Sequence, residues 1–135
     1  MNVALHIFKK MTQCPDLTAL EVQGEIFSYK ELVTLSMHTA SMLVNLGARC
    51  EAIGVVGQKS PSSYLGVLGT IFAGCHYVPI NLKYDAQKQI KILKDSKIRI
   101  LIGDSDDLEC FYEKLDSEVS DSIEFWLDPC RNTVN

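Results

Sequence analysis

The segment 68-LGTIFAGCHYVPIN-81 decides how the chain is organised. Leu68, Phe72 and Cys75 recur at steps of three and four residues, which predicts the last turns of a buried helix. Gly74 stands where this apolar pattern stops. We therefore expect Gly74 to end the helix in the left-handed conformation that glycine adopts without strain.

The residues after Gly74 are predicted to form a short strand in the core of a sheet. His76, Tyr77 and Val78 favour extended backbone, and Pro79 lacks the N–H that a sheet ladder uses, so Pro79 is predicted to end the strand. A buried helix thus passes into a strand within about three residues. We expect the rest of the chain to form similar helix–strand units on either side.

The residues before this segment predict two helices and a hairpin. A short amphipathic helix is expected over Val3 to Met11, and Ala19 to Val22 with Ile26 to Phe27 indicates a β-hairpin around Gly24. Ser28 and Glu31 have the spacing of a capping box, so a helix is expected to begin there. Gly47 is predicted to end it. Its buried face is expected to carry Leu32, Leu35, Ala40, Leu43 and Leu46.

The remaining elements alternate between strands and helices. Ser60 and Pro61 are expected to start the helix that contains the small residues Gly66, Gly69 and Ala73, and Asp85 to cap a helix carrying Ile90 and Leu93. The other expected elements are strands over Ile53 to Val56, Ile98 to Ile102 and Ile123 to Leu127, and a polar helix over Asp104 to Leu115. This order predicts an α/β fold: an open, mainly parallel sheet with helices on both faces. We expect the chain to form a single domain over residues 1–127, followed by a polar tail over 128–135.

Composition limits the classes of partner. The chain has 135 residues and a net charge of −4 without a run of Lys or Arg, which argues against nucleic acid as a partner. No apolar stretch approaches the roughly 18 residues of a membrane span, and the N-terminus does not resemble a secretory signal. The five cysteines are widely spaced, so we expect reduced thiols that act as small apolar side chains, in a cytoplasmic protein.

Several residues are candidates for carrying chemistry. Gly54 to Gly57 lacks the longer glycine pattern of a phosphate-binding loop. Lys59–Ser60 could hold an anion at a helix start, but helix capping by Ser60 and a solvated lysine are the favoured interpretation. Cys75 and His76 are adjacent, which suggests a catalytic pair. On a strand, however, neighbouring side chains point to opposite faces, so we expect no such pair.

Acidic and aromatic residues have similar alternatives. The carboxylates of Asp104, Asp106, Asp107 and Glu109 suit a helix N-terminus better than a metal site, and Tyr64, Tyr77 and Tyr84 suit packing with a solvated hydroxyl. We assign no catalytic, cofactor-binding or metal-ligating residue.

Three segments, in register, resemble the adenylate-forming enzymes. The first is the Ala–Gly–x–x–aromatic–Val–Pro–aliphatic pattern within Leu68 to Asn81. The second, Phe27 to Leu32 (FSYKEL), is similar to an early Ser/Thr–Tyr–x–Glu–Leu motif, and the third is Asn81 to Ser96 (NLKYDAQKQIKILKDS). The resemblance spans roughly Phe8 to Leu127 and identifies the chain as similar to the N-terminal subdomain of this superfamily.

The resemblance implies an activity for a larger parent enzyme. Such enzymes activate a carboxylate with ATP and Mg²⁺ and pass the acyl group to coenzyme A or to a carrier-protein thiol. The family's phosphate loop, its later nucleotide-binding segments and its C-terminal lobe are absent from this chain. We therefore expect this chain alone to bind no cofactor, and we transfer no functional residue from the family.

The chain also departs from the family pattern in places. Asn81, Asp85 and Lys88 stand where many members have Asp, Pro and Arg, and Cys75 and His76 replace small residues. The residues around Asn81 are closer to amino-acid-activating members, such as peptide synthetases, than to fatty-acyl ones.

Three functional hypotheses follow. The first is an inactive N-terminal fragment of an AMP-forming ligase, either excised from a longer protein or encoded by a shortened gene. The second is a stand-alone, non-catalytic interaction module derived from that fold. The third is an unrelated nucleotide-binding α/β domain, which the missing glycine motif disfavours. The expected partners are the remainder of the enzyme or a second copy in a homodimer.

Overall fold

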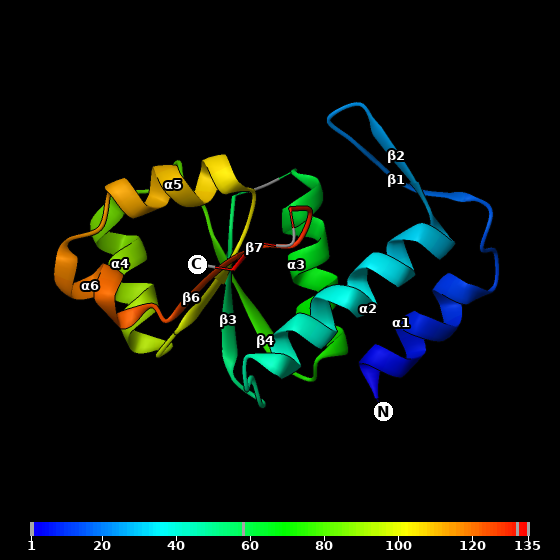
Figure 1. Ribbon diagram of the computed structural model, residues 1–135, viewed down its shortest axis with the longest axis horizontal. Coiled ribbons are helices and arrows are strands. Elements are labelled where there is room, and N and C mark those ends of the chain that lie inside the picture. The colour runs from blue at the N-terminus through cyan, green and yellow to red at the C-terminus, as the bar shows by residue number, and fades with distance from the viewer. Residues whose placement is uncertain (1, 58, 132, 135) are drawn as a thin grey trace.

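The computed structural model describes residues 2–57, 59–131 and 133–134 (Figure 1). Helices and strands alternate along most of the chain, as the sequence predicts. The helices are α1 (Val3–Thr12), α2 (Tyr29–Asn45), α3 (Pro61–Phe72), α4 (Ala86–Asp95), α5 (Ser105–Glu113) and α6 (Ser117–Ser122). The strands are β1 (Thr18–Val22), β2 (Glu25–Ser28), β3 (Ala52–Val56), β4 (His76–Ile80), β5 (Ile100–Ile102), β6 (Phe125–Asp128) and β7 (Thr133–Val134).

The main sheet has the strand order β4-β3-β5-β6-β7. β3 pairs in parallel with β4 and β5, and β5 pairs in parallel with β6, whereas β7 pairs antiparallel to β6. Strands β1 and β2 form a separate hairpin that projects from the body of the molecule (Figure 1). The predicted mainly parallel sheet and the predicted hairpin are both confirmed.

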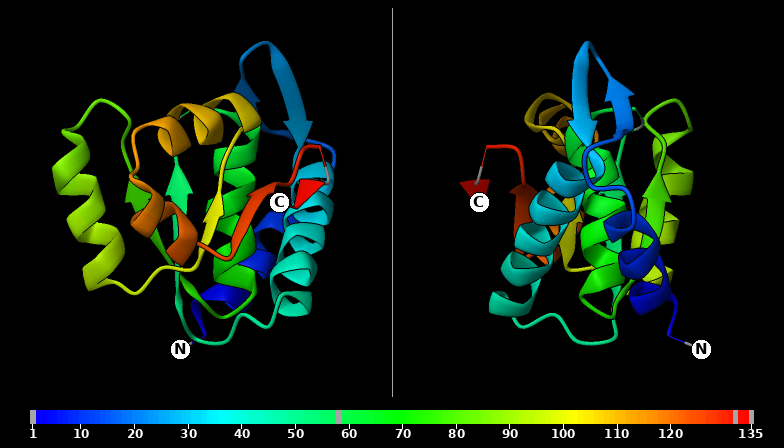
Figure 2. Two further views of the ribbon diagram at one scale, coloured as in Figure 1. Left: turned by 60° about the vertical axis from the view of Figure 1, so that its left-hand side comes forward. Right: turned by 90° about the vertical axis from the view of Figure 1, so that its right-hand side faces the viewer.

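Helices cover both faces of the sheet, as expected for parallel strands (Figure 2). On one face, Leu93 of α4, Phe111 of α5 and Val119 of α6 pack with side chains of β3 and β5. On the other face, Leu43 of α2 packs with Ile53 and with other side chains from the strands. Helix α1 lies outside α2 and α3 and forms a third apolar cluster with them.

The predicted helix ends are confirmed by their hydrogen bonds. Ser28 and Glu31 form the reciprocal capping box, and Ser60 caps α3 through Ser63, with Pro61 in the first turn. Asp85 accepts a hydrogen bond from the first turn of α4. Gly74 has φ +77°, in the left-handed region, and ends α3 as predicted.

The strand that begins at His76 differs from its prediction. β4 continues through Pro79 to Ile80, so the prediction that Pro79 ends the strand is wrong. In the described part of the chain β4 lies at the edge of the sheet, and four of its five residues are exposed or half-buried, so the prediction of a core strand is also wrong. An edge strand has one side without a ladder, so the missing N–H of a proline is tolerated there.

The C-terminal third also departs from its prediction. The polar helix covers Ser105–Glu113, with Asp104 as its N-cap, and the second short helix α6 follows it. The strands expected over Ile98 to Ile102 and Ile123 to Leu127 are β5 and β6, which begin later than expected. Within the segment predicted as a polar tail, Asp128 completes β6 and Thr133–Val134 form β7.

Some predicted burial was wrong. Leu35, expected on the buried face of α2, is 37% exposed, because Val33, Ser36 and Thr39 occupy the inner positions instead. Cys14, Cys50, Cys110 and Cys130 are exposed thiols, so for these four the interpretation as apolar packing side chains is wrong. Among the described residues, no helix combines the length and the apolar character needed to cross a membrane.

Candidate functional site

The carboxyl ends of the parallel strands bring distant segments of the chain together. The chain leaves β3 toward the face that carries α3, and it leaves β5 toward the opposite face, which carries α5. The adjacent strands β3 and β5 therefore form a topological switch point. In open α/β sheets, ligands bind outside the carboxyl ends of the strands at such a point, so this edge is the first place to look for a site.

A buried carboxylate connects the elements at this edge. Asp128, at the end of β6, is only 2% exposed. Its Oδ1 accepts hydrogen bonds from Ser62 Oγ in α3 at 2.5 Å and from the Cys130 backbone N–H at 3.1 Å. Its Oδ2 accepts from the Ser105 hydroxyl at 2.6 Å and the Ser105 backbone N–H at 2.8 Å, at the start of α5. Asp128 thus ties the first turns of two helices, one on each face, to the sheet.

The hydrogen bonds also decide the charge of this group. Burial raises the pKa of Asp128, but the hydrogen bonds from Ser105 and Ser62 outweigh it, so the pKa lies below its ordinary value. Arg131 adds a positive charge 3.9 Å from Oδ2. Asp128 is therefore a charged anchor whose oxygens are occupied by donors, which suits a structural role better than that of a general base.

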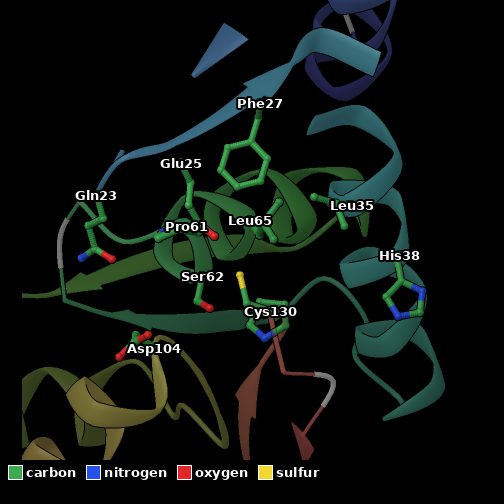
Figure 3. A pocket seen from close by; sticks show the side chains of 11 residues that line it. Gln23, Glu25, Phe27, Leu35, His38, Pro61, Ser62, Leu65, Asp104 and Cys130 are labelled. Atoms are coloured by element: carbon green, nitrogen blue, oxygen red, sulfur yellow. The ribbon is translucent and has the colours of Figure 1, made fainter. Parts of the chain in front are cut away.

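Beside this anchor, an open groove of about 370 Å³ lies between the hairpin and the body of the molecule (Figure 3). We call it the hairpin groove. Its volume is at the lower end of the range of ligand pockets. Its lining comes from the hairpin (Gln23, Glu25, Phe27), α2 (Leu35, His38), α3 (Pro61, Ser62, Leu65) and the segments after β5 and β6 (Asp104, Pro129, Cys130).

Negative charge dominates the environment of the thiol in this groove. Loss of solvation raises the pKa of Cys130, and the charges of Asp128, Glu25 and Asp104 raise it further, against an opposing hydrogen bond with Ser62. The thiol is thus held in its neutral form, and its carboxylate neighbours make the groove a poor environment for an anion.

The residues that were considered for phosphate or anion binding, Gly54, Gly57 and Ser60, have structural roles. Gly54 lies within β3, and Gly57 follows the strand with φ +84°. Ser60 is 1% exposed and is engaged in capping α3, so the capping interpretation of Lys59–Ser60 accounts for its position. The hydrogen bonds of Ser60 thus support its predicted role as a helix cap.

The candidate cysteine–histidine pair and the candidate tyrosines do not line the hairpin groove. Cys75 directly precedes β4 and His76 begins it, and together with Tyr77 they line a separate open hollow. Among the described residues, no group of three or more His, Cys, Asp or Glu side chains is placed to hold a metal ion. The residues Tyr64, Tyr77 and Tyr84 are 37%, 44% and 55% exposed, and Lys88 lies over the Tyr84 ring at 4.9 Å.

The acidic residues near α5 serve the helix start. Asp104 is the N-cap and accepts a hydrogen bond from the Asp106 N–H, and Asp106 and Asp107 lie in the first turn. Burial raises the pKa of Asp107, and the neighbouring charges of Asp104 and Asp106 raise it further. Of these residues, only Asp104 also lines the hairpin groove.

Asp128 and its serine partners were missed from the sequence. Ser62 and Ser105 are 66 and 23 residues from Asp128, and serine near a helix start has an adequate local explanation. The available signal was a carboxylate directly after an apolar strand, because such residues lie at the carboxyl edge of a parallel sheet.

Comparison with known proteins identifies the family. The family model described as "AMP-binding enzyme" matches residues 7–130. The chain is 30% identical over 114 residues to tyrocidine synthase 3 of Brevibacillus parabrevis, covering 77% of this chain and 2% of that protein. It is 32% identical over 89 residues to tyrocidine synthase 1 of the same organism, covering 65% of this chain and 8% of that protein.

Solved structures agree on the fold. The nonribosomal peptide synthetase FmoA3 superposes with a TM-score of 0.82 at 22% identity, over 98% of this chain and 14% of that one. The anthranilate CoA ligase AuaEII gives a TM-score of 0.80 at 20% identity, over 93% of this chain and 24% of that one. The chain thus spans a small part of the relatives that it matches. It belongs to the AMP-binding, adenylate-forming enzyme superfamily, and it corresponds to a portion of the N-terminal subdomain.

Proposed function

We propose that this chain is the N-terminal part of an AMP-forming ligase that activates an amino or acyl carboxylate with ATP and Mg²⁺. The observation that supports this proposal is the family match over residues 7–130, combined with coverage of only 2% of tyrocidine synthase 3. The relatives named as peptide synthetases favour an amino acid as the substrate of the parent enzyme. The acceptor would then be a carrier-protein thiol, with coenzyme A as the alternative, in the cytoplasm.

We further propose that the chain alone is inactive and binds no cofactor. Stabilisation of an adenylyl-transfer transition state depends on positioned cations and backbone donors around the phosphates. The loop after β3 contains Lys59 but lacks the glycine pattern that precedes the lysine of a phosphate-binding loop. The carboxyl edge of the sheet instead holds an engaged carboxylate, Asp128, and the negatively charged surroundings of Cys130.

The test is ATP–pyrophosphate exchange with a panel of amino and fatty acids. The purified chain should remain at background, while a complete adenylation domain assayed in parallel exchanges label. Exchange that survives rigorous purification and follows the protein through successive columns would refute the proposed inactivity.

A second candidate is a non-catalytic interaction module derived from the same fold. It is favoured by the three apolar clusters that the described residues bury by themselves, since such a chain can fold alone. The two candidates are separated by joining the chain to the remainder of a related adenylation domain. Recovered exchange supports the fragment, whereas a folded but inactive chimera supports the module.

Self-association is the expected behaviour of the isolated chain under either candidate. Exposed apolar side chains on α2, among them Met37 at 42% and Val44 at 58%, are the kind of surface that finds a partner. A two-fold dimer is the simplest closed arrangement. Light scattering should show a dimer or a larger species at micromolar concentration, and a monomer of 15.1 kDa throughout would contradict this expectation.

A further inference from the structure

We propose that the hairpin groove is a docking site for a polypeptide segment that inserts a long cationic side chain, lysine or arginine, between the hairpin and α3. This inference does not depend on the proposed function. It concerns a binding surface of the folded chain, and it holds or fails whether or not the parent enzyme forms adenylates.

The groove combines apolar walls with acidic ends. Phe27 of the hairpin, Leu35 of α2 and Leu65 of α3 supply apolar surface from three elements. Glu25 and Asp104 lie across the groove from one another, with Ser62 and Cys130 between them (Figure 3). None of the described residues that line the groove is Lys or Arg.

This combination matches the chemistry of lysine and arginine. Both carry a charged group on a long apolar stem, and the stem packs on apolar surface while the charged group stays at the wet, polar end. The carboxylates of Glu25 and Asp104 supply the opposite charge. Their field already reaches the groove, since both raise the pKa of the Cys130 thiol.

The position of the groove favours a polypeptide over a small ligand. The groove is open to solvent rather than enclosed, and its apolar wall continues to Leu35, which is 37% exposed on α2. Apolar neighbours of the cationic residue in an extended segment would cover that wall. A small amine would leave it in water, so an isolated cation should bind more weakly than a peptide.

The test is titration of the isotope-labelled chain with acetyl-Leu-Arg-Leu-amide, followed by amide chemical shifts. The matched peptide with citrulline in place of arginine keeps the shape and removes the charge, and free arginine amide represents the small-ligand alternative. We expect the arginine peptide to shift amides around Glu25, Leu65 and Cys130, and to bind more weakly as salt screens the charges.

Two variants remove the proposed charges without removing the fold. Glu25→Gln keeps the length of the side chain, and Asp104→Asn keeps a residue that caps α5 well. Each should weaken peptide binding by about 2–5-fold, the range for partly exposed ion pairs. Glu21→Gln on the same hairpin and Asp106→Asn on the same helix are the controls, because neither residue lines the groove.

The proposal is overturned by any of four results. These are absence of shifts at the groove, equal binding of the citrulline peptide, equal binding of free arginine amide, or equal effects of the test and control variants. Loss of a dimer in Glu25→Gln or Asp104→Asn, measured by light scattering without peptide, would assign the groove to a second copy and would also overturn it.

Discussion

Replacing Asp128 by Asn tests whether the buried carboxylate holds the carboxyl edge of the sheet together. The substitution keeps the shape of the side chain but removes the charge, and it turns an amide N–H₂ toward donors that need an acceptor. A hydrogen bond to a charged group contributes about 1.5–3 kcal/mol. Asp128 accepts several such bonds in a site that is 2% exposed. Because Asn keeps one oxygen as an acceptor, we expect the loss of stability to be only slightly larger than that of one bond, about 2–4 kcal/mol.

Urea unfolding at pH 7, followed by tryptophan fluorescence, measures this loss. Trp126, two residues before Asp128 in β6, lies against Tyr112 with ring centroids 5.5 Å apart, so its emission reports directly on this part of the sheet. The matched control is Asp106→Asn, an exposed carboxylate at the start of α5, which should cost less than about 1 kcal/mol.

The pH dependence adds a second signature with a definite sign. The folded-state pKa of Asp128 is lowered, so the folded state favours the charged form and the resulting stability is present above the unfolded pKa of about 3.9. That stability is lost as the pH falls through the folded-state pKa. The difference between the wild type and Asp128→Asn should therefore shrink from pH 7 toward pH 3. A loss below about 0.5 kcal/mol at pH 7, comparable to the error of such measurements, or a difference that does not change with pH, would refute the reasoning.

Three further outcomes are expected. Gly74→Val should lower the free energy of unfolding by roughly 1–3 kcal/mol, because φ is +77° there, although the added Cβ would meet no neighbouring atom within 4 Å; an unchanged thermal melt contradicts this. Gly69→Ala should also destabilise the chain, since its Cβ would lie 2.5 Å from Thr39 Cγ2, and overpacking of about 1–3 kcal/mol outweighs a helix-propensity gain of about 1 kcal/mol; a raised melting temperature would show that α2 yields easily. Cys130 should be alkylated with a midpoint above that of free cysteine, and Glu25→Gln should lower that midpoint, as measured by peptide mass mapping across pH; a midpoint that Glu25→Gln leaves in place would contradict the assigned field.

The sequence alone determined the features that depend on neighbours along the chain. The capping box at Ser28, the start of α3 at Ser60 and the left-handed turn at Gly74 each involve residues within a few positions of one another. The alternation of apolar strands and amphipathic helices was sufficient to predict the α/β class. The periodicity of apolar residues identifies each element, and the rules for connections between strands allow few topologies. Each of the three segments that resemble adenylate-forming enzymes is likewise recognised from residues that are close together in the chain.

The tertiary structure alone decided the features that depend on pairing between distant segments. Whether β4 is central or at an edge depends on the strand order, and this order explains why Pro79 can lie inside it. The place of Asp128 depends on serines 66 and 23 residues away, and the hairpin groove exists only because the hairpin lies over α3 and the segment after β6. Local propensity carries no information about such contacts, since they form only when the sheet brings its carboxyl ends to one edge.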